Sequence, residues 1–141
     1  MFENVLVAID GSQSGREALA AAIEAADPSG SEVTVLHVLG QKVMWATAVD
    51  LESQDEAVAL TDAAVRELSA AGLPARAKVV HAPTGQIAEE ILRVAKDIDA
   101  SVIVMGTRGL SDAKSLLLGS VAHAVVHHSA CPVLLVPATH A

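Results

Sequence analysis

Three glycines and a serine in the C-terminal part of the chain have a spacing that suits phosphate binding. Gly106, Gly109, Gly119 and Ser120 follow an apolar run, residues 101–105, and precede a segment with helical periodicity. Glycine lets a backbone approach a ligand closely, and the first N–H groups of a helix are unpaired and point toward an anion. These residues therefore predict a phosphate cradle, with an ordinary turn that leads into a helix as the alternative.

The polar side chains around these glycines leave further alternatives open. Ser120 could bond a phosphate oxygen through its hydroxyl or cap the helix that follows it. Arg108 and Lys114 carry the positive charge of the intervening loop, and each could contact a ligand or lie in solvent. The stretch is not a P-loop, because it lacks the Gly-Lys-Ser/Thr of that motif. It is not the dinucleotide motif G-x-G-x-x-G either, because its glycines have a different spacing.

Asp10 is the carboxylate best placed to join such a site, because it directly follows the apolar run of residues 4–9. It could hydrogen-bond a ribose hydroxyl, help to hold Mg²⁺ or Mn²⁺ carried by phosphates, or only cap a turn with Gly11. A phosphoacceptor role is disfavoured, because the additional acids and the lysine that such a site uses are not found at the ends of the other apolar runs.

Histidine and cysteine offer weaker candidates. His123 and His127 have a spacing that places them on one helical face, but no third metal ligand is evident, so we expect surface or interface positions. Cys131 is the only cysteine, which excludes an internal disulfide and suits a reducing compartment and a packing role. No set of serine, histidine and aspartate indicates nucleophilic catalysis.

Length and composition predict one domain, residues 1–141, with a well-packed core. Apolar residues make up 52% of the chain and only Phe2 and Trp45 are aromatic, so valine, leucine, isoleucine and alanine must fill the core.

The formal charge of −8 argues against a nucleic-acid partner. No apolar run approaches the roughly 20 residues of a membrane span, and the first residues lack a basic signal-peptide region. We therefore expect a cytoplasmic protein with no membrane contact.

Apolar runs alternate with helical patterns along the whole chain. This order predicts an α/β fold, a doubly wound parallel sheet of five strands with four helices. Ser14 and Ser53 each precede a glutamate by three residues and are the expected caps of the first two helices. Pro83 and Thr84 are expected to open the third helix. Residues 40–50 have no clear period and are interpreted as a loop, with a slight preference for a lid over the ligand. The predicted strands are residues 4–9, 32–39, 75–80, 101–105 and 132–137, the last at an edge.

The predicted strand ends bring the candidate residues toward one crevice. Ligands of such sheets bind beyond the carboxyl ends of the strands, where the strand order reverses. Asp10 follows the first strand, Val38 lies near the end of the second, and Met105 and Gly106 end the fourth. If the first and fourth strands are neighbours, Asp10 and the glycine loop face each other.

With these residues in view, the chain resembles the universal stress protein family over essentially its whole length. The similar segments are residues 5–12, 35–38, 103–109, 117–123 and 131–136. The family's ATP-binding signature, G-x2-G-x9-G-[S/T], is met by Gly106, Gly109, Gly119 and Ser120. This spacing is typical of the nucleotide-binding branch of the family.

The resemblance implies an adenine nucleotide alpha hydrolase-like sheet of strand order 3-2-1-4-5, a role in stress response, and a homodimer. It implies that the dimer forms through the last strand, Val133, Leu134, Leu135 and Val136, whose edge would otherwise be unpaired. It also implies an ATP site, with ADP and AMP as alternatives, in which Asp10 lies near the ribose and the main chain of Val38 meets adenine. Ala8 is implied at the nucleoside, and Met105 and Gly106 between ribose and phosphate. The residues implied at the phosphates are Gly109, Gly119, Ser120 and Val121. Thr107 and Arg108 are implied more weakly.

The residues favour binding over catalysis. Fast phosphoryl transfer needs a metal, a positioned nucleophile and charge stabilisation together. The sequence offers a phosphate cradle and one carboxylate that could lie beside a nucleotide-bound metal, but no evident base. A nucleotide-responsive binding module is therefore the main hypothesis. A slow ATPase or phosphotransferase is the second, and a structural dimer without nucleotide is the third.

Overall fold

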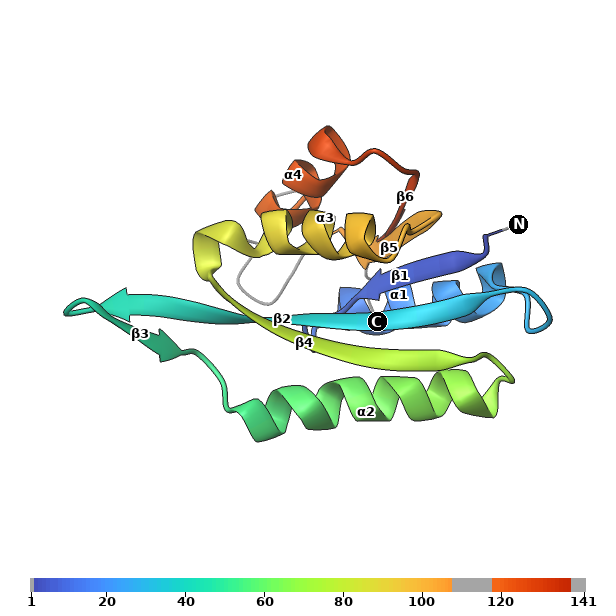
Figure 1. Cartoon of the computed structure of the whole chain (residues 1–141), viewed down its shortest axis with the longest axis horizontal. Helices are drawn as coiled ribbons and strands as arrows, with labels where there is room; N and C mark the ends of the chain where they lie inside the picture. Colours follow the sequence, from blue (N-terminus) through green and yellow to red (C-terminus); the bar gives the residue numbers. More distant parts are fainter. Residues whose placement is uncertain (1, 108–117, 138–141) are drawn as a thin grey trace.

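The computed structural model describes residues 2–107 and 118–137, which form one sheet with helices on both of its faces (Figure 1). The strands are β1 (Asn4–Ala8), β2 (Glu32–Met44), β3 (Thr47–Asp50), β4 (Ala75–Pro83), β5 (Val102–Gly106) and β6 (Val133–Val136). The helices are α1 (Gln13–Ala25), α2 (Gln54–Ala70), α3 (Ile87–Asp97) and α4 (Ser120–His128), and a 3₁₀ turn (Thr84–Gln86) precedes α3. The α/β class and the four helices agree with the prediction.

The sheet has six strands, one more than predicted. Five of them pair in parallel in the spatial order β4-β2-β1-β5-β6, which is the predicted order 3-2-1-4-5. The additional strand, β3, pairs antiparallel with the far end of β2, from Gln41↔Asp50 to Met44↔Thr47. The expectation of a purely parallel five-stranded sheet is therefore wrong by this one strand.

The interpretation of residues 40–50 as a loop is also wrong. β2 continues to Met44, five residues beyond its predicted end, and returns through Trp45 and Ala46 into β3. Figure 1 shows the resulting β2–β3 hairpin projecting beyond the rest of the sheet. Its two turn residues have positive φ angles, 52° for Trp45 and 63° for Ala46, without a glycine or asparagine that would mark a hairpin turn in the sequence.

Two cores lie on opposite faces of the sheet, as the valine-rich strands predict. On one face α1 and α2 cover Val5, Val33 and Val104, and on the other α3 and α4 cover Leu6 and Ile103. Because neighbouring residues of a strand point to opposite faces, each central strand contributes to both cores. This packing fixes the central strands and thereby the positions of their carboxyl ends.

The helix caps are partly as predicted. Ser53 caps α2 as expected, because its Oγ accepts from the Glu56 N–H at 3.0 Å; the Glu56 carboxylate accepts from the Ser53 hydroxyl at 3.1 Å rather than from its backbone N–H, so the capping box is only half formed. In α1 the cap is Ser12, whose Oγ accepts from the Gly15 N–H at 3.1 Å, so the assignment of Ser14 is wrong. The third helix begins at Ile87, after the 3₁₀ turn, rather than at Pro83 and Thr84.

Candidate functional site

The carboxyl ends of β1 and β5 lie side by side and level with the middle of β2, with β1 between its two partners. Ala8, the last residue of β1, is in register with Leu36 of β2 and Met105 of β5. The chain leaves β1 through α1 to reach β2, whereas β5 is reached through α3 on the opposite face of the sheet. The strand order therefore reverses at this point, which is where α/β sheets bind ligands.

A pocket of about 350 Å³ opens at this reversal. Its volume lies within the range of pockets that hold small molecules and cofactors. Most of the predicted binding residues that the structure describes line it together: Ala8, Asp10, Val38, Met105, Gly106, Ser120 and Val121.

The other predicted residues do not line the pocket in the described part of the chain. Thr107 and Gly119 lie beside it and are tied to each other, because the Gly119 N–H donates to the Thr107 carbonyl at 2.6 Å. The Thr107 N–H in turn donates to the carbonyl of Val136 at 3.1 Å. Arg108 and Gly109, like Lys114, lie outside the described residues.

Asp10 forms the turn that the sequence offered as one of its roles. Its Oδ1 accepts from the Ser12 N–H at 2.9 Å, and Gly11 between them has a φ of 86°. A side-chain Cβ at Gly15 would lie 3.2 Å from the same carboxylate oxygen, so glycine at the start of α1 leaves room for Asp10. The turn directs the Asp10 carboxylate to the pocket while the rest of the segment enters α1.

Gly106 has a structural requirement that the sequence did not reveal. A Cβ at this position would lie 1.8 Å from Ser14 Oγ and 2.8 Å from the Ser14 carbonyl carbon, distances that no real contact allows. The buried Ser14 hydroxyl donates to the carbonyl of Val136 at 3.1 Å and so ties α1 to the end of β6. The sequence explains the glycine at position 106 by the close approach of a ligand. In the structure α1 also approaches this position closely, through Ser14.

The N-terminus of α4 faces the pocket. Gly119 is its N-cap, and no side chain of a described residue caps the helix, so Ser120 is the first helical residue and does not fill the capping role offered for it. Ser120, Val121 and Ala122 line the pocket with the first turn of the helix. The N–H groups of such a turn lack intrahelical partners and carry the positive end of the helix dipole, a suitable environment for an anion.

The pocket also contains a polar pair that sequence reasoning missed, His37 and Glu52. His37 is a buried side chain of β2, and its Nδ1 lies 2.8 Å from the carbonyl oxygen of Ile9. Its Nε2 is in hydrogen-bond contact with Glu52 Oε1, from the segment between β3 and α2. The available signal was a histidine among the valines and leucines of residues 35–39.

The remaining walls of the pocket are mainly apolar, formed by Leu36, Gly40, Leu51, Ile87 and Ile91 with Thr84. The expected lid is not formed by the tip of the hairpin, because Trp45 is 96% exposed and neither it nor Met44 lines the pocket. Among the described lining residues Asp10 and Glu52 are the acidic ones, and none is a lysine or arginine. Any positive charge from Arg108 or Lys114 would have to come from outside the described residues.

The weaker candidates of the sequence lie away from the pocket lining. His123 and His127 stack on one face of α4 with ring centroids 6.2 Å apart, and the described residues contain no cluster of three metal-ligating side chains. Cys131 is half-buried against the core beneath α3 and α4, in agreement with its expected packing role. No helix within residues 2–107 and 118–137 is long and apolar enough to cross a membrane.

Comparison with known proteins identifies the family. Residues 1–137 match the model of the Universal stress protein family. Universal stress protein YxiE of Bacillus subtilis is 35% identical over 150 residues, which cover 96% of this chain and 99% of the relative.

Solved structures give the same result. A universal stress protein structure from Archaeoglobus fulgidus is 27% identical with a TM-score of 0.75, covering 96% of this chain and 99% of the other. Another from the same organism, in complex with dAMP, is 24% identical with a TM-score of 0.73 and covers 96% and 98%. The chain belongs to the universal stress protein family.

Proposed function

We propose that the protein is an adenine-nucleotide-binding module whose ligand occupies the pocket formed by the ends of β1 and β5 and the middle of β2. The observation that carries the proposal is that seven residues chosen from the sequence line one pocket beside the N-terminus of α4. Structural neighbours support it, since universal stress protein structures hold dAMP, cAMP and AMP. ATP with Mg²⁺ or Mn²⁺ is the ligand that the glycine signature favours.

The lining suggests an orientation for the nucleotide. Adenine would lie against the main chain of Val38 with Ile87 and Ile91 nearby, and the ribose would meet Asp10. The phosphates would extend toward the first turn of α4, where Ser120 and Val121 face the pocket. Arg108 and Gly109, the other residues proposed for phosphate contact, follow the end of β5 in sequence. A metal ion carried by the phosphates would lie near the Asp10 carboxylate.

Binding is proposed rather than rapid turnover. Phosphoryl transfer depends on metal, nucleophile and cationic stabilisation held together. The ionisable side chains that line the described part of the pocket are Asp10, Glu52 and His37, and the last two are engaged with each other. A slow ATPase or phosphotransferase is the alternative, and a rate near the typical enzyme value of ~10 per second with ATP and magnesium would favour it.

The test of binding is calorimetric titration with ATP, combined with mass spectrometry of nucleotide that copurifies with the protein. Gly119 has an ordinary extended conformation, φ −66° and ψ 159°, so Gly119→Val does not strain the backbone but adds bulk where phosphates would lie. We expect ATP affinity to fall at least a hundredfold in this variant, because the side chain competes for the phosphate position. Gly30→Val is the control, since Gly30 lies in the turn before β2, at the opposite end of the sheet.

We further propose that two copies associate through β6 in the cytoplasm. In the described part of the chain β6 pairs with β5 alone, which leaves its other edge available. The side chain to test is Leu134, which is 39% exposed, because Leu135 packs toward the core beneath α3 and α4. Leu134→Asp should weaken the dimer in sedimentation velocity, whereas Val58→Asp, at an equally exposed position of α2, should not. An intact dimer in the Leu134 variant would place the interface elsewhere.

A further inference from the structure

His37 connects two walls of the pocket that are far apart in the sequence. Through Nδ1 it contacts the carbonyl oxygen of Ile9, the residue before Asp10, and through Nε2 it contacts the carboxylate of Glu52. Ile9 is itself held by β2, because its N–H donates to the carbonyl of Leu36 at 2.9 Å. The ring of His37 therefore joins the end of β1 to the segment that enters α2.

The hydrogen-bond roles of the two ring nitrogens follow from their partners. A carbonyl oxygen can only accept, so Nδ1 must carry a hydrogen that it donates to Ile9. Nε2 then faces an oxygen of Glu52, and one further proton must lie between the two atoms, on either the ring or the carboxyl group.

The second partner, Glu52, belongs to a wall with few other attachments. The N–H of the neighbouring Leu51 donates to the carbonyl of Gly40 at 3.0 Å, and Ser53 begins the cap of α2. Leu51 and Glu52 both line the pocket, and the Glu52 side chain is 29% exposed. Without the contact to His37, this wall would be fixed to the sheet at Gly40 but not at its position over the end of β1.

We propose that His37 is a positioning residue for nucleotide binding, which acts by holding Asp10 and the Leu51–Glu52 wall in place before the ligand arrives. This inference rests on the proposed function and deepens it. A preformed pocket binds more tightly because less freedom is lost on binding. His37 acts on the nucleoside end of the pocket, so it affects every adenine ligand to the same degree, whatever its number of phosphates.

The experiment compares Glu52→Ala and Glu52→Gln with the wild-type protein by calorimetry, using adenosine, AMP and ATP. Glutamine restores the contact, because its amide N–H can donate to a neutral His37 whose Nδ1 hydrogen remains on Ile9. We expect Glu52→Ala to bind all three ligands about tenfold more weakly, since it loses the partly buried polar contact with His37. Glu52→Gln should stay within about twofold of the wild type. Gly119→Val is the contrasting control, because it should weaken ATP far more than adenosine.

His37→Asn addresses the same contact from the other side. An asparagine amide can take the place of Nδ1 at the Ile9 carbonyl but is too short to reach Glu52, so this variant should behave like Glu52→Ala. In ligand-free protein both variants should show faster amide exchange at Leu51, whose N–H is bonded to Gly40. Because Glu52 is partly exposed, its variants keep the test decisive if His37→Asn does not fold.

The outcomes separate this inference from the proposed function. Folded Glu52→Ala protein with unchanged affinity for all three ligands overturns the role of His37 and leaves nucleotide binding intact. Glu52→Gln that is as weak as Glu52→Ala also overturns it, because the carboxylate would then be needed for the ligand itself. Wild-type protein that binds none of the three ligands removes the proposed function, and this inference with it.

Discussion

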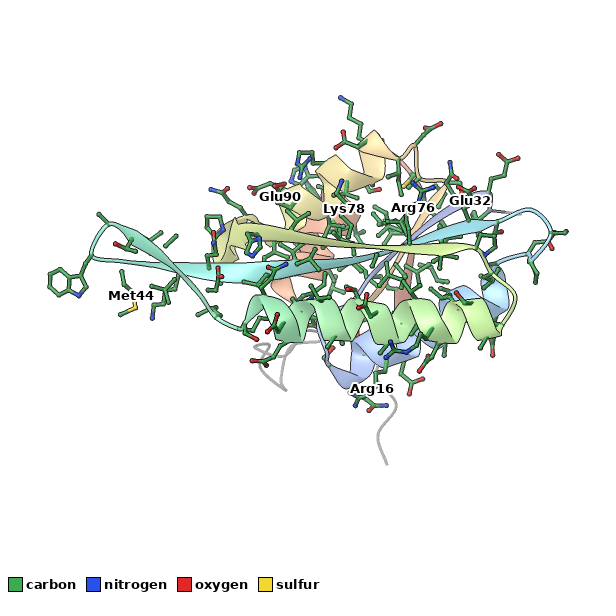
Figure 2. The ribbon with its side chains drawn as sticks, turned by 60° about the horizontal axis from the view of Figure 1, so that its bottom comes forward. Arg16, Glu32, Met44, Arg76, Lys78 and Glu90 are labelled. Atoms are coloured by element: carbon green, nitrogen blue, oxygen red, sulfur yellow. The ribbon has the colours of Figure 1, made fainter. Side chains whose placement is uncertain are left out.

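The two halves of β2 both contain valine, but in opposite environments. In the first half Val33, Val35 and Leu36 are buried, because β1 and β4 flank the strand and helices cover both faces. In the second half Val43 is 63% exposed, and Met44 is exposed beside it. Figure 2 shows Met44 near the end of the hairpin, well away from the helices.

The difference shows that the burial of a valine in this strand depends on which elements flank it. β1 has 5 residues and β2 has 13, so β2 continues past the end of its partner. The candidate pocket lies where the environment changes, and Val38 and Gly40 of β2 line it. The parallel half of β2 thus builds the core and its middle forms a binding wall. Beyond the end of β4, the far end of β2 pairs with β3 alone among the described strands.

The largest effect should come from the same substitution made in each half, Val35→Ala and Val43→Ala. Val35 is fully buried between the sheet and its helices, so the lost methyl groups and the remaining cavity should lower the free energy of unfolding by about 2 kcal/mol or more. Val43 is largely exposed and its replacement should cost less than about 1 kcal/mol. Urea denaturation measures both, and equal losses would mean that the hairpin is buried in solution.

Much of the buried half could be predicted from the sequence, because apolar runs bounded by glycine and proline define the parallel strands. The pairing of these strands and the cap at Ser53 followed from the same local signals. The hairpin could not be predicted in this way. Its turn residues, Trp45 and Ala46, adopt positive φ angles that alanine and tryptophan rarely take, so the sequence contains no recognisable turn signal.

The residues of the candidate site likewise differ in whether they could be predicted from the sequence. Asp10, Val38 and Met105 could be assigned to it because each lies at the end of a recognisable strand. Glu52 could not, because its position depends on how the chain returns from the unpredicted hairpin to α2. Ser14 beneath Gly106 was hidden for another reason, since the contact joins a helix and a strand far apart in the sequence.

A smaller effect is expected at Gly40, where the two halves of β2 meet. A Cβ here would lie 3.1 Å from Thr84 Cγ2 and 3.6 Å from Leu51 Cδ1, so Gly40→Ala should press on the pocket wall and cost about 1 kcal/mol. Gly85→Ala is the control, because no atom of the described residues lies within 4 Å of a Cβ at that position. Thermal unfolding of both proteins measures the difference. If Gly40→Ala is as stable as the control, the wall at the junction is not tightly packed.

The smallest effect on global stability, and the most local one, concerns the tip of the hairpin. Trp45 and Ala46 hold φ angles of 52° and 63°, a conformation that costs a residue with a side chain roughly 1 kcal/mol or more. The double substitution Trp45→Asn and Ala46→Gly supplies residues suited to both positions, so it should slow amide exchange in Thr47–Asp50. Residues of β1 should exchange as before, because β3 pairs with the far end of β2 and not with β1. Unchanged or faster exchange in β3 would show that the tryptophan itself stabilises the turn. In that case the Trp45 side chain would favour the hairpin conformation, and the positive φ angles of the turn would not make it unfavourable overall.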